Sequence, residues 1–544
     1  MMMLLSQSRA LTGVVIGLLL VVTSGLYAEM SLPLDPNYTI PGLDTNSTAV
    51  YAIPQFPKQS YGMPFIYPTF HTRLIRITGV PGQSFPIESG GSGIWGGNAR
   101  HHYSKDQPWN SDGTLIAILN EQGSATPNAI LLDGDTYQVK YGKCGNYSLG
   151  DDRWHPSPLY PHIRINATGS VLQWFDVTIC TVVRSWSLPF STGSAFGSYE
   201  GNPSFDGRFA VMCNSDGSKL CVVDMDPQPP LASYDSGNRR IGPVYTGATV
   251  SGMGFDWASV SPSGKYCVVA YDSPDTDHLR VFDINSTTLA ITPRTMPAGS
   301  LECSCHTDVN DGWIYHLGHA DMTLNPFDAN EDVIIGQIRS GYCPSKNPGG
   351  STFGKVVMVR LRDNTVSTVT TGTNEASPFH ISTRNFMRPG WAYVTYWPGS
   401  GKRFNDEIIA VKMDGSGKVE RLAHTHSNTG AGGDIGYYAE PQAVPSLDGR
   451  RVIFASNWAS NCSPTCGSYN TYDIQDYAIE TMPVGDLTHG GLVDFEDLEW
   501  FLLSWLNNGC VAPGWCGGSD LNLSSAVDFA DFSKFAADWL NDSI

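Results

Sequence analysis

The sequence predicts an all-β propeller of seven blades followed by a small α-helical module. The first observation is a β-hairpin signature that recurs along the chain, in which a turn rich in Asn, Asp, Ser and Gly separates two runs of alternating apolar residues. The second is the spacing of these turns, from 38 to about 65 residues, which suits one four-stranded blade each. The third is a separate repeat of 34 residues near the end of the chain.

The hairpin turns form one series. In the last copy, the stretch 440–458, a Ser/Asp-Gly turn at Gly449 leads into a strand in which Val452 and Phe454 alternate with other side chains. The seven turns are Asn110–Gly113, Asn166–Gly169, Ser204–Gly207, Ser261–Gly264, Asn325–Asn330, Met387–Gly390 and the turn at Gly449. Two stacked β-sandwiches are the alternative, but a single regular series favours a ring.

The run HTRLIRITG, residues 71–79, lies before the first turn and has no hairpin of its own. We expect it to complete the last blade, so that strand pairing between the two ends of the chain closes the ring. Residues 29–70 are rich in Pro, Asn and Thr and are predicted to form an extended lead-in on the propeller surface. The propeller is thereby placed at residues 71–482.

Composition and the N-terminus indicate export. Residues 1–28 combine Arg9, the apolar run Leu11–Val22 and small residues up to Ala28, as a secretory signal peptide does, and no later segment is long enough to cross a bilayer. The net charge of −19 and the pI near 5.0 disfavour nucleic acid as a partner. We therefore expect a secreted or cell-surface protein with no membrane span.

The 12 cysteines fit an oxidising compartment. Their spacing predicts the pairs Cys510–Cys516 and Cys462–Cys466, and Cys213 with Cys221 could bridge a hairpin. The cluster Cys303-x-Cys305-His306 has ligand types suited to zinc, although disulfides are the more common use of such cysteines outside the cell.

The C-terminal module, residues 485–544, is a duplicated loop and helix. GDLTHGGLVDFEDLEWFLLSWL aligns with SDLNLSSAVDFADFSKFAADWL, and each copy carries apolar residues at helical spacing after an acidic loop. The apolar residues are Leu498, Phe501, Leu502 and Trp505 in the first copy and Phe532, Phe535, Ala536 and Trp539 in the second. Two short helices can bury such stripes only against each other.

This duplicated loop and helix, with the intervening CVAPGWC, resembles a type I dockerin. The resemblance implies a helical module that binds a cohesin-type receptor, with calcium held in each loop by clustered oxygens, the donors that this hard ion takes. In the second loop the implied ligands are Asp520, Asn522, Ser524, the carbonyl of Ala526, Asp528 and Asp531. The first loop keeps only Asp486, Asp494 and Asp497, with Thr488 and Gly490 where ligands belong, so calcium is expected mainly in the second loop. The alternative is a metal-free pair of helices capped by Asp494 and Asp528.

Ionisable residues precede the hairpin turns, where the innermost strands of a propeller open onto its axial channel. A lyase acting on a uronic-acid polymer must neutralise the carboxylate, remove the neighbouring proton and protonate the leaving oxygen. We predict His102, Tyr103, His162 and Arg384 for these catalytic roles. For each histidine alone, a structural hydrogen bond near the axis is the competing interpretation.

The stretch GHADMTLNPFDANEDVIIG and the His, Glu and Gln of the last two blades resemble parts of oligogalacturonate-lyase-like propellers. The resemblance implies a divalent metal in the channel, with His319, His380 and Gln442 as ligands. A glycoside hydrolase would instead need two carboxylates, for which Glu200, Asp256 and Glu440 are available. The remaining alternative is a non-catalytic propeller that binds glycan or protein and is recruited by the dockerin-like module.

Overall fold

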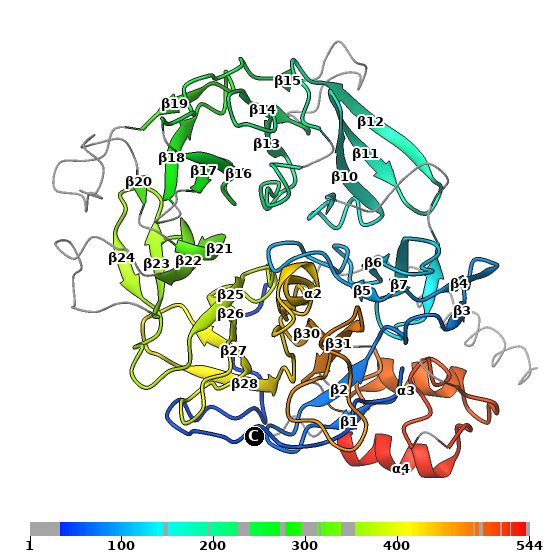
Figure 1. Cartoon of the computed structure of the whole chain (residues 1–544). Coiled ribbons are helices and arrows are strands. Elements are labelled where there is room, and N and C mark those ends of the chain that lie inside the picture. The colour runs from blue at the N-terminus through cyan, green and yellow to red at the C-terminus, as the bar shows by residue number, and fades with distance from the viewer. Residues whose placement is uncertain are drawn as a thin grey trace, which may run out of the picture.

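The computed structural model describes residues 33–142, 144, 151–193, 196–226, 240–251, 253–272, 278–294, 313–314, 317–338, 354–481, 483, 485–488, 493–511, 514–522 and 524–539. The chain is mostly β, and its sheets stand side by side in a ring around a central axis (Figure 1). Three short helices are present in this described part. The expected signal peptide and the Cys303-x-Cys305-His306 cluster lie outside it.

The strands are grouped in successive antiparallel sets along the chain. The first four sets are β5 (Asn98–Arg100), β6 (Leu115–Glu121), β7 (Ala129–Asp133) and β8 (Val139–Tyr141); β9 (Arg153–Trp154), β10 (Ile163–Thr168), β11 (Val171–Asp176) and β12 (Thr181–Ser187); β13 (Phe209–Cys213), β14 (Leu220–Asp224) and β15 (Arg240–Ile241); and β16 (Gly254–Val260), β17 (Tyr266–Asp272), β18 (His278–Ile284) and β19 (Ile291–Pro293), with β20 (Trp313–Ile314) on β18. The next two are β21 (Leu317–Asn325), β22 (Glu331–Ile338), β23 (Val356–Arg360) and β24 (Val366–Thr368), then β25 (Pro378–Ser382), β26 (Trp391–Tyr396), β27 (Glu407–Lys412) and β28 (Val419–His424). The last is β29 (Val444–Pro445), β30 (Arg451–Ser456) and β31 (Ile474–Glu480), joined by β2 (Arg73–Arg76) and β1 (Phe65–Ile66), while β3 (Ser84–Pro86) and β4 (Ser92–Ile94) form a separate hairpin.

The pairing predicted between the two ends of the chain is confirmed. Strand β2 runs antiparallel to β31, with Leu74 opposite Ile479 and Arg76 opposite Tyr477. A short parallel pairing of β31 with β5 then links the last set to the first. The ring therefore closes through an N-terminal strand inserted at the C-terminal end of the propeller.

The turns owe their shape to side chains as well as to glycine. In the turn at Gly207, Ser204 Oγ accepts from the backbone N–H of Phe209 at 2.9 Å and donates to Asp206 Oδ1 at 2.6 Å. Gly207 has a φ of 73°, which favours glycine. The turn from Ser446 to Gly449 repeats these contacts.

One turn of the predicted series is placed wrongly. Asn166–Gly169 joins the second and third strands of its set, β10 and β11, whereas the turns of the first, fourth, fifth, sixth and last sets join the first two strands, and Ser204–Gly207 leads into β13, the first strand described in the third set. The connection at that place in the second set is the segment 155–162 between β9 and β10, in which Tyr160 N–H donates to Ser157 O at 3.0 Å. Its proline-rich sequence lacks the glycine turn that marks the other copies.

The disulfides Cys462–Cys466 and Cys510–Cys516 are confirmed, and Cys144 pairs with Cys180. The predicted bridge between Cys213 and Cys221 is wrong, because both are free thiols. Cys213 lies opposite Leu220, and Cys221 lies opposite Met212. Neighbouring positions on a strand point to opposite faces, so the two thiols pack into different cores.

The lead-in lies along the sixth and seventh sets of strands. Ile40 N–H donates to Glu420 Oε1 at 2.9 Å, and Arg421 Nη1 donates to Ala49 O at 2.9 Å. Tyr67, fully buried, shares hydrogen bonds of 2.9 Å with His424 Nδ1 and 2.8 Å with His426 Nε2. The segment is thereby fixed to strands that follow it by more than 300 residues.

The two predicted C-terminal helices are present as α3 (Phe495–Leu503) and α4 (Phe529–Asp538). Phe501 and Phe535, which are 34 residues apart, stack at 5.3 Å between ring centroids in the core of the module. Leu502 is 54% exposed, so it does not belong to the buried stripe. None of the helices in the described part of the chain is long and apolar enough to cross a membrane.

Candidate active site in the channel

Three neighbouring inner strands lose their regular pairing. The register shifts fall at residues 255–258 of β16, 318–321 of β21 and 378–381 of β25. Such irregularities turn side chains out of the normal alternation and are common beside active sites. The residues displaced in this way include Asp256, His319 and His380. His319 also has a φ of 46°, a conformation that costs energy for a residue other than glycine.

In the first set of strands, a longer segment of the chain leaves the sheet. Residues 101–108 leave the sheet between β5 and Trp109, which returns to pair with Ile116. This segment carries Tyr103 and Lys105 toward the inside of the ring, where both line the same cavity as His319.

Tyr103, His319 and His380 meet in one cluster. The Tyr103 hydroxyl and His319 Nδ1 share a hydrogen bond of 3.0 Å. The His380 ring lies 4.3 Å from that of His319 and 5.5 Å from that of Tyr103, and its Nε2 is 3.7 Å from Glu440 Oε2. Burial and the nearby carboxylates, Glu200 first among them, raise the pKa of Tyr103 well above its usual value. The phenol is therefore protonated at neutral pH and available as a proton donor.

The cavity beside this cluster has a volume of about 170 Å³. Its polar lining residues are Tyr103, Lys105, Glu200, Asp256, Trp257 and His319. Lys105 forms an ion pair with Glu200, and its ammonium lies 4.0 Å from the centroid of the Trp257 ring. Lys105 is the one lysine or arginine among the described residues that line the cavity.

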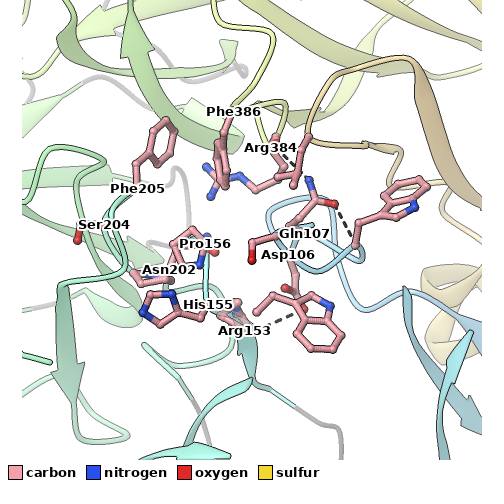
Figure 2. Close-up of a pocket in the computed structure, with 15 residues that line it drawn as sticks. Asp106, Gln107, Arg153, His155, Pro156, Asn202, Ser204, Phe205, Arg384 and Phe386 are labelled. Carbon is pink, nitrogen blue, oxygen red and sulfur yellow. Dashed lines mark hydrogen bonds and ion pairs between the residues drawn. The ribbon is translucent and has the colours of Figure 1, made fainter. Parts of the chain in front are cut away.

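Arg384 lies in a different part of the channel. Arg384 does not line the cavity itself, but it lines both a second hollow, which shares Lys105, Glu200, Trp257 and Ala320 with the cavity, and a third beyond it. Figure 2 shows Arg384 beside Phe205 and Phe386 in that third hollow, which has a volume of about 20 Å³ and accepts little more than a water molecule. The guanidinium is engaged by Asp321, with Nε–Oδ2 at 2.9 Å and Nη2–Oδ1 at 2.7 Å. This ion pair with Asp321 indicates that Arg384 has a structural role.

The other two predicted catalytic residues are not among the described residues that line the cavity. His102 faces Asp106, with Nδ1 3.5 Å from Oδ2. His162 lies in the connection between β9 and β10, where its carbonyl accepts from Val177 N–H at 3.0 Å. His155, close to His162 in the sequence, packs against Trp174 and has a pKa lowered to about 3 by burial.

Two of the three predicted metal ligands of the channel are engaged by protein side chains. Gln442 Oε1 accepts a hydrogen bond from Arg100 Nη2, and His319 Nδ1 is engaged by Tyr103. Across the described part of the chain, no three His, Cys, Asp or Glu side chains come close enough together to bind one metal.

In the loops of the C-terminal module, carboxylates accept hydrogen bonds from backbone N–H groups of the same loop. Asp531 is fully buried and accepts from the N–H groups of Asn522 at 2.9 Å and Asp528 at 2.8 Å, and Asp497 has the corresponding position in the first loop. Asp494 and Asp528 cap α3 and α4 by accepting from Glu496 and Ala530 N–H. The second loop is closed further by Asp520, which accepts from Ser524 and Ser525 N–H, and by Ser524 Oγ, 3.2 Å from Ala526 O. Of the first loop, Asp486 is buried and Gly490 lies outside the described residues.

Sequence reasoning missed Lys105 and Trp257. Lys105 follows the His-His-Tyr run by only two residues and could have been noticed there, because it is the nearest cation to Tyr103 in the sequence. Trp257 adjoins Asp256, but nothing in the sequence separates it from the many core tryptophans.

The fold resembles solved propeller-like structures at low identity. An oligogalacturonate lyase in complex with manganese shows 11% identity and a TM-score of 0.45, over 78% of this chain and 98% of that one. An oligogalacturonate lyase from Vibrio parahaemolyticus shows 11% identity and a TM-score of 0.41, over 77% and 96%. A β-propeller domain from Myceliophteria thermophila shows 10% identity and a TM-score of 0.37, over 71% and 99%. No family model matches the sequence, and neither does any curated protein.

Proposed function

We propose that this chain is an exported carbohydrate-active enzyme that cleaves a uronic-acid-containing polysaccharide by β-elimination in its channel. The observation that carries the proposal is the cluster of Tyr103, His319 and His380, which register shifts in two strands and a departure from a third bring together beside a cavity. Strained and irregular backbone of this kind is concentrated at functional sites.

In β-elimination, a base removes the proton on the carbon next to the carboxylate, a carbon–carbon double bond forms, and the adjacent carbon–oxygen bond breaks. The His319 imidazole, which lines the cavity, takes that proton, and the fully buried His380 ring, 4.3 Å from it, holds it in position. Tyr103, kept protonated by its raised pKa, donates its proton to the leaving oxygen. His319, which shares a hydrogen bond with Tyr103 through Nδ1, then gives the phenolate a proton, so that the proton taken from the substrate restores both groups.

The reaction also requires a positively charged group beside the substrate carboxylate, to neutralise it. Arg384, for which the sequence suggested this role, is already engaged by Asp321. Lys105 lies in the cavity itself, and the substrate carboxylate takes the place of Glu200 beside its ammonium. Because Lys105 is almost completely buried, this interaction is stronger than the same pair would be in water.

Glycoside hydrolysis is the second candidate, because Glu200 and Asp256 line the same cavity. The two reactions differ in their products. β-Elimination creates an unsaturated uronyl end that absorbs ultraviolet light, whereas hydrolysis creates reducing ends without that absorbance.

The test is an assay of both products on a panel of acidic polysaccharides, with and without a chelator. We expect ultraviolet absorbance in the wild type, its loss in His319→Ala, and its retention in His162→Ala, a histidine that does not line the cavity. Reducing ends without absorbance would favour the hydrolase. Neither product on any polymer would leave the propeller as a non-catalytic binding module.

We propose in addition that the ring has seven blades, the nine-stranded sheet counting as two, and that residues 485–544 form a dockerin-like module. The oxygen-rich second loop, from Asp520 to Asp531, has the donor chemistry that calcium takes. By this proposal the module binds a cohesin-type receptor and holds the exported enzyme where polysaccharide is degraded. The duplicated helices and their shared core support a compact module.

A further inference from the structure

Helix α2 (Gly433–Tyr438) lies near the middle of the ring (Figure 1). Arg100, buried in β5, fixes its C-terminal end, with Nη1 donating to Tyr438 O at 2.8 Å and Nη2 donating to Gln442 Oε1. The first turn is preceded by Gly432 and begins at Gly433, whose φ values are 64° and 54°. A single buried arginine and a glycine pair therefore set the position of this short helix.

Tyr437 lies at the C-terminal end of this helix, close to the cluster in the channel. Its backbone carbonyl accepts from Glu440 N–H at 3.0 Å, and the Glu440 carboxylate lies 3.7 Å from His380 Nε2. Nearly half of the Tyr437 side chain is exposed, at 48%. The helix therefore holds a partly exposed aromatic ring near the candidate active site.

Two more tyrosines continue outward from Tyr437. The rings of Tyr437 and Tyr438 are 5.5 Å apart, and those of Tyr438 and Tyr472 are 6.3 Å apart. Tyr438 and Tyr472 are partly exposed and pack on Ala439, Ala455 and Ile474 of the propeller. Aromatic rings held on a firm base and joined to a cavity provide apolar faces on which successive sugar rings can stack.

The charges around these tyrosines are acidic. Asp434 lies in the first turn of α2, and Glu440 lies two residues after Tyr438. The guanidinium of Arg100, which reaches Tyr438 O, is already taken up by carbonyl oxygens and Gln442. A run of uronates would be repelled here, whereas uncharged sugar units would not.

We propose that Tyr437, Tyr438 and Tyr472 form a binding track for uncharged sugar units that flank the reacting uronate. This rests on the proposed function and narrows its substrate class: a polymer in which uronic acids are separated by neutral sugars, or carry esterified carboxyl groups, rather than an unbroken polyuronate. Tyr437 contacts the unit next to the cavity, and Tyr472 contacts a unit farther out.

The experiment uses the full chain and measures both cleavage and binding. Cleavage is compared on esterified and de-esterified forms of one polyuronate and on an alternating neutral–uronic polymer. Binding of uncharged and acidic oligosaccharides is measured by titration of tyrosine and tryptophan fluorescence in the His319→Ala background. We expect Tyr437→Ala and Tyr472→Ala to weaken binding of the uncharged ligands about tenfold, and Tyr437→Phe, which keeps the ring, to bind within about twofold of the parent.

The outcomes separate the two proposals. Weaker binding in Tyr437→Ala, together with no cleavage by the wild type, would support the binding track and refute the proposed lyase activity. The binding track would be refuted, and the lyase activity supported, if cleavage were fastest on the unbroken polyuronate and KM were unchanged in both alanine variants. No binding of any oligosaccharide would overturn the track as well. A loss in Tyr437→Phe equal to that in Tyr437→Ala would show that the hydroxyl, and not stacking, is responsible.

Discussion

Replacement of Arg384 by Met should damage the stability of the ring and not the chemistry of the channel. The guanidinium donates to Asp321 through Nε and Nη2, and Nη2 also donates to Met322 O at 2.7 Å. Asp321 is 3% exposed and also accepts from Thr383 N–H and Oγ1, at 2.8 and 2.9 Å. The pair therefore joins β21 to the end of β25, on two neighbouring sets of strands.

The magnitude follows from the burial of Asp321. Methionine keeps most of the volume but leaves a buried carboxylate without its cation, and breaking a buried pair in this way costs about 3–5 kcal/mol. The two N–H and O–H bonds from Thr383 reduce that cost, so we expect the lower end, about 3 kcal/mol. In a chain of this size that corresponds to a fall in Tm of roughly 3–4 °C.

The assay is denaturant unfolding followed by tryptophan fluorescence, together with the cleavage assay well below the new Tm. Arg362→Met is the matched control, because Arg362 is 52% exposed and pairs with Glu331 on the surface, where a loss below about 0.5 kcal/mol is expected. The double variant Arg384→Met, Asp321→Asn should recover part of the lost stability. Unchanged stability with lost cleavage in Arg384→Met would refute this reasoning and return Arg384 to a catalytic role.

Three further results are expected. Tyr103→Phe should lower kcat about 10²- to 10⁴-fold while the free energy of unfolding changes by about 1 kcal/mol, as steady-state kinetics and denaturant unfolding would show; an unchanged kcat would remove Tyr103 from the mechanism. The pKa of His155, lowered to about 3 by burial, means that its contribution to stability is fully present above about pH 6.5 and is lost as the pH falls toward 3. Between pH 7 and pH 4.5, the free energy of unfolding of His155→Phe should therefore fall by about 2–3 kcal/mol less than that of the wild type. Parallel pH profiles of Tm for the two proteins would contradict this. Calorimetry of the full chain with calcium should show one dominant site that disappears in Asp528→Ala, and equal binding after that change would argue against the loop assignment.

The repeat of the ring could be predicted from the sequence because the hydrogen bonds of each turn join residues that are close together in the sequence. Ser204, Asp206 and Gly207 form their hydrogen bonds within six residues, so the pattern appears in the sequence wherever it is used. The closing strand at 71–79 was predictable for a related reason: it is an apolar strand with no partner nearby. The second turn was misplaced because a glycine turn also joins β10 to β11.

The site was harder to predict because it depends on departures from the repeat. His319 and His380 could be selected as ionisable residues near the axis, but the register shifts that bring them together leave no signature in the sequence. Arg384 looked equally suitable until its burial beside Asp321 was known. Lys105 is placed by its contacts with Glu200 and Trp257, from two other sets of strands, and such long-range contacts have no local pattern.

The late joining of β2 to β31 also constrains how the protein can be made. On the ribosome β2 emerges with its neighbour β1 but about 400 residues before β31, so the edge that pairs with β31 stays open through nearly the whole of translation. Any chain that stops short of residue 474 lacks β31 altogether and leaves the circle open. Assembly of the native ring is thus tied to completion of the polypeptide, which favours folding after synthesis has reached the final blade.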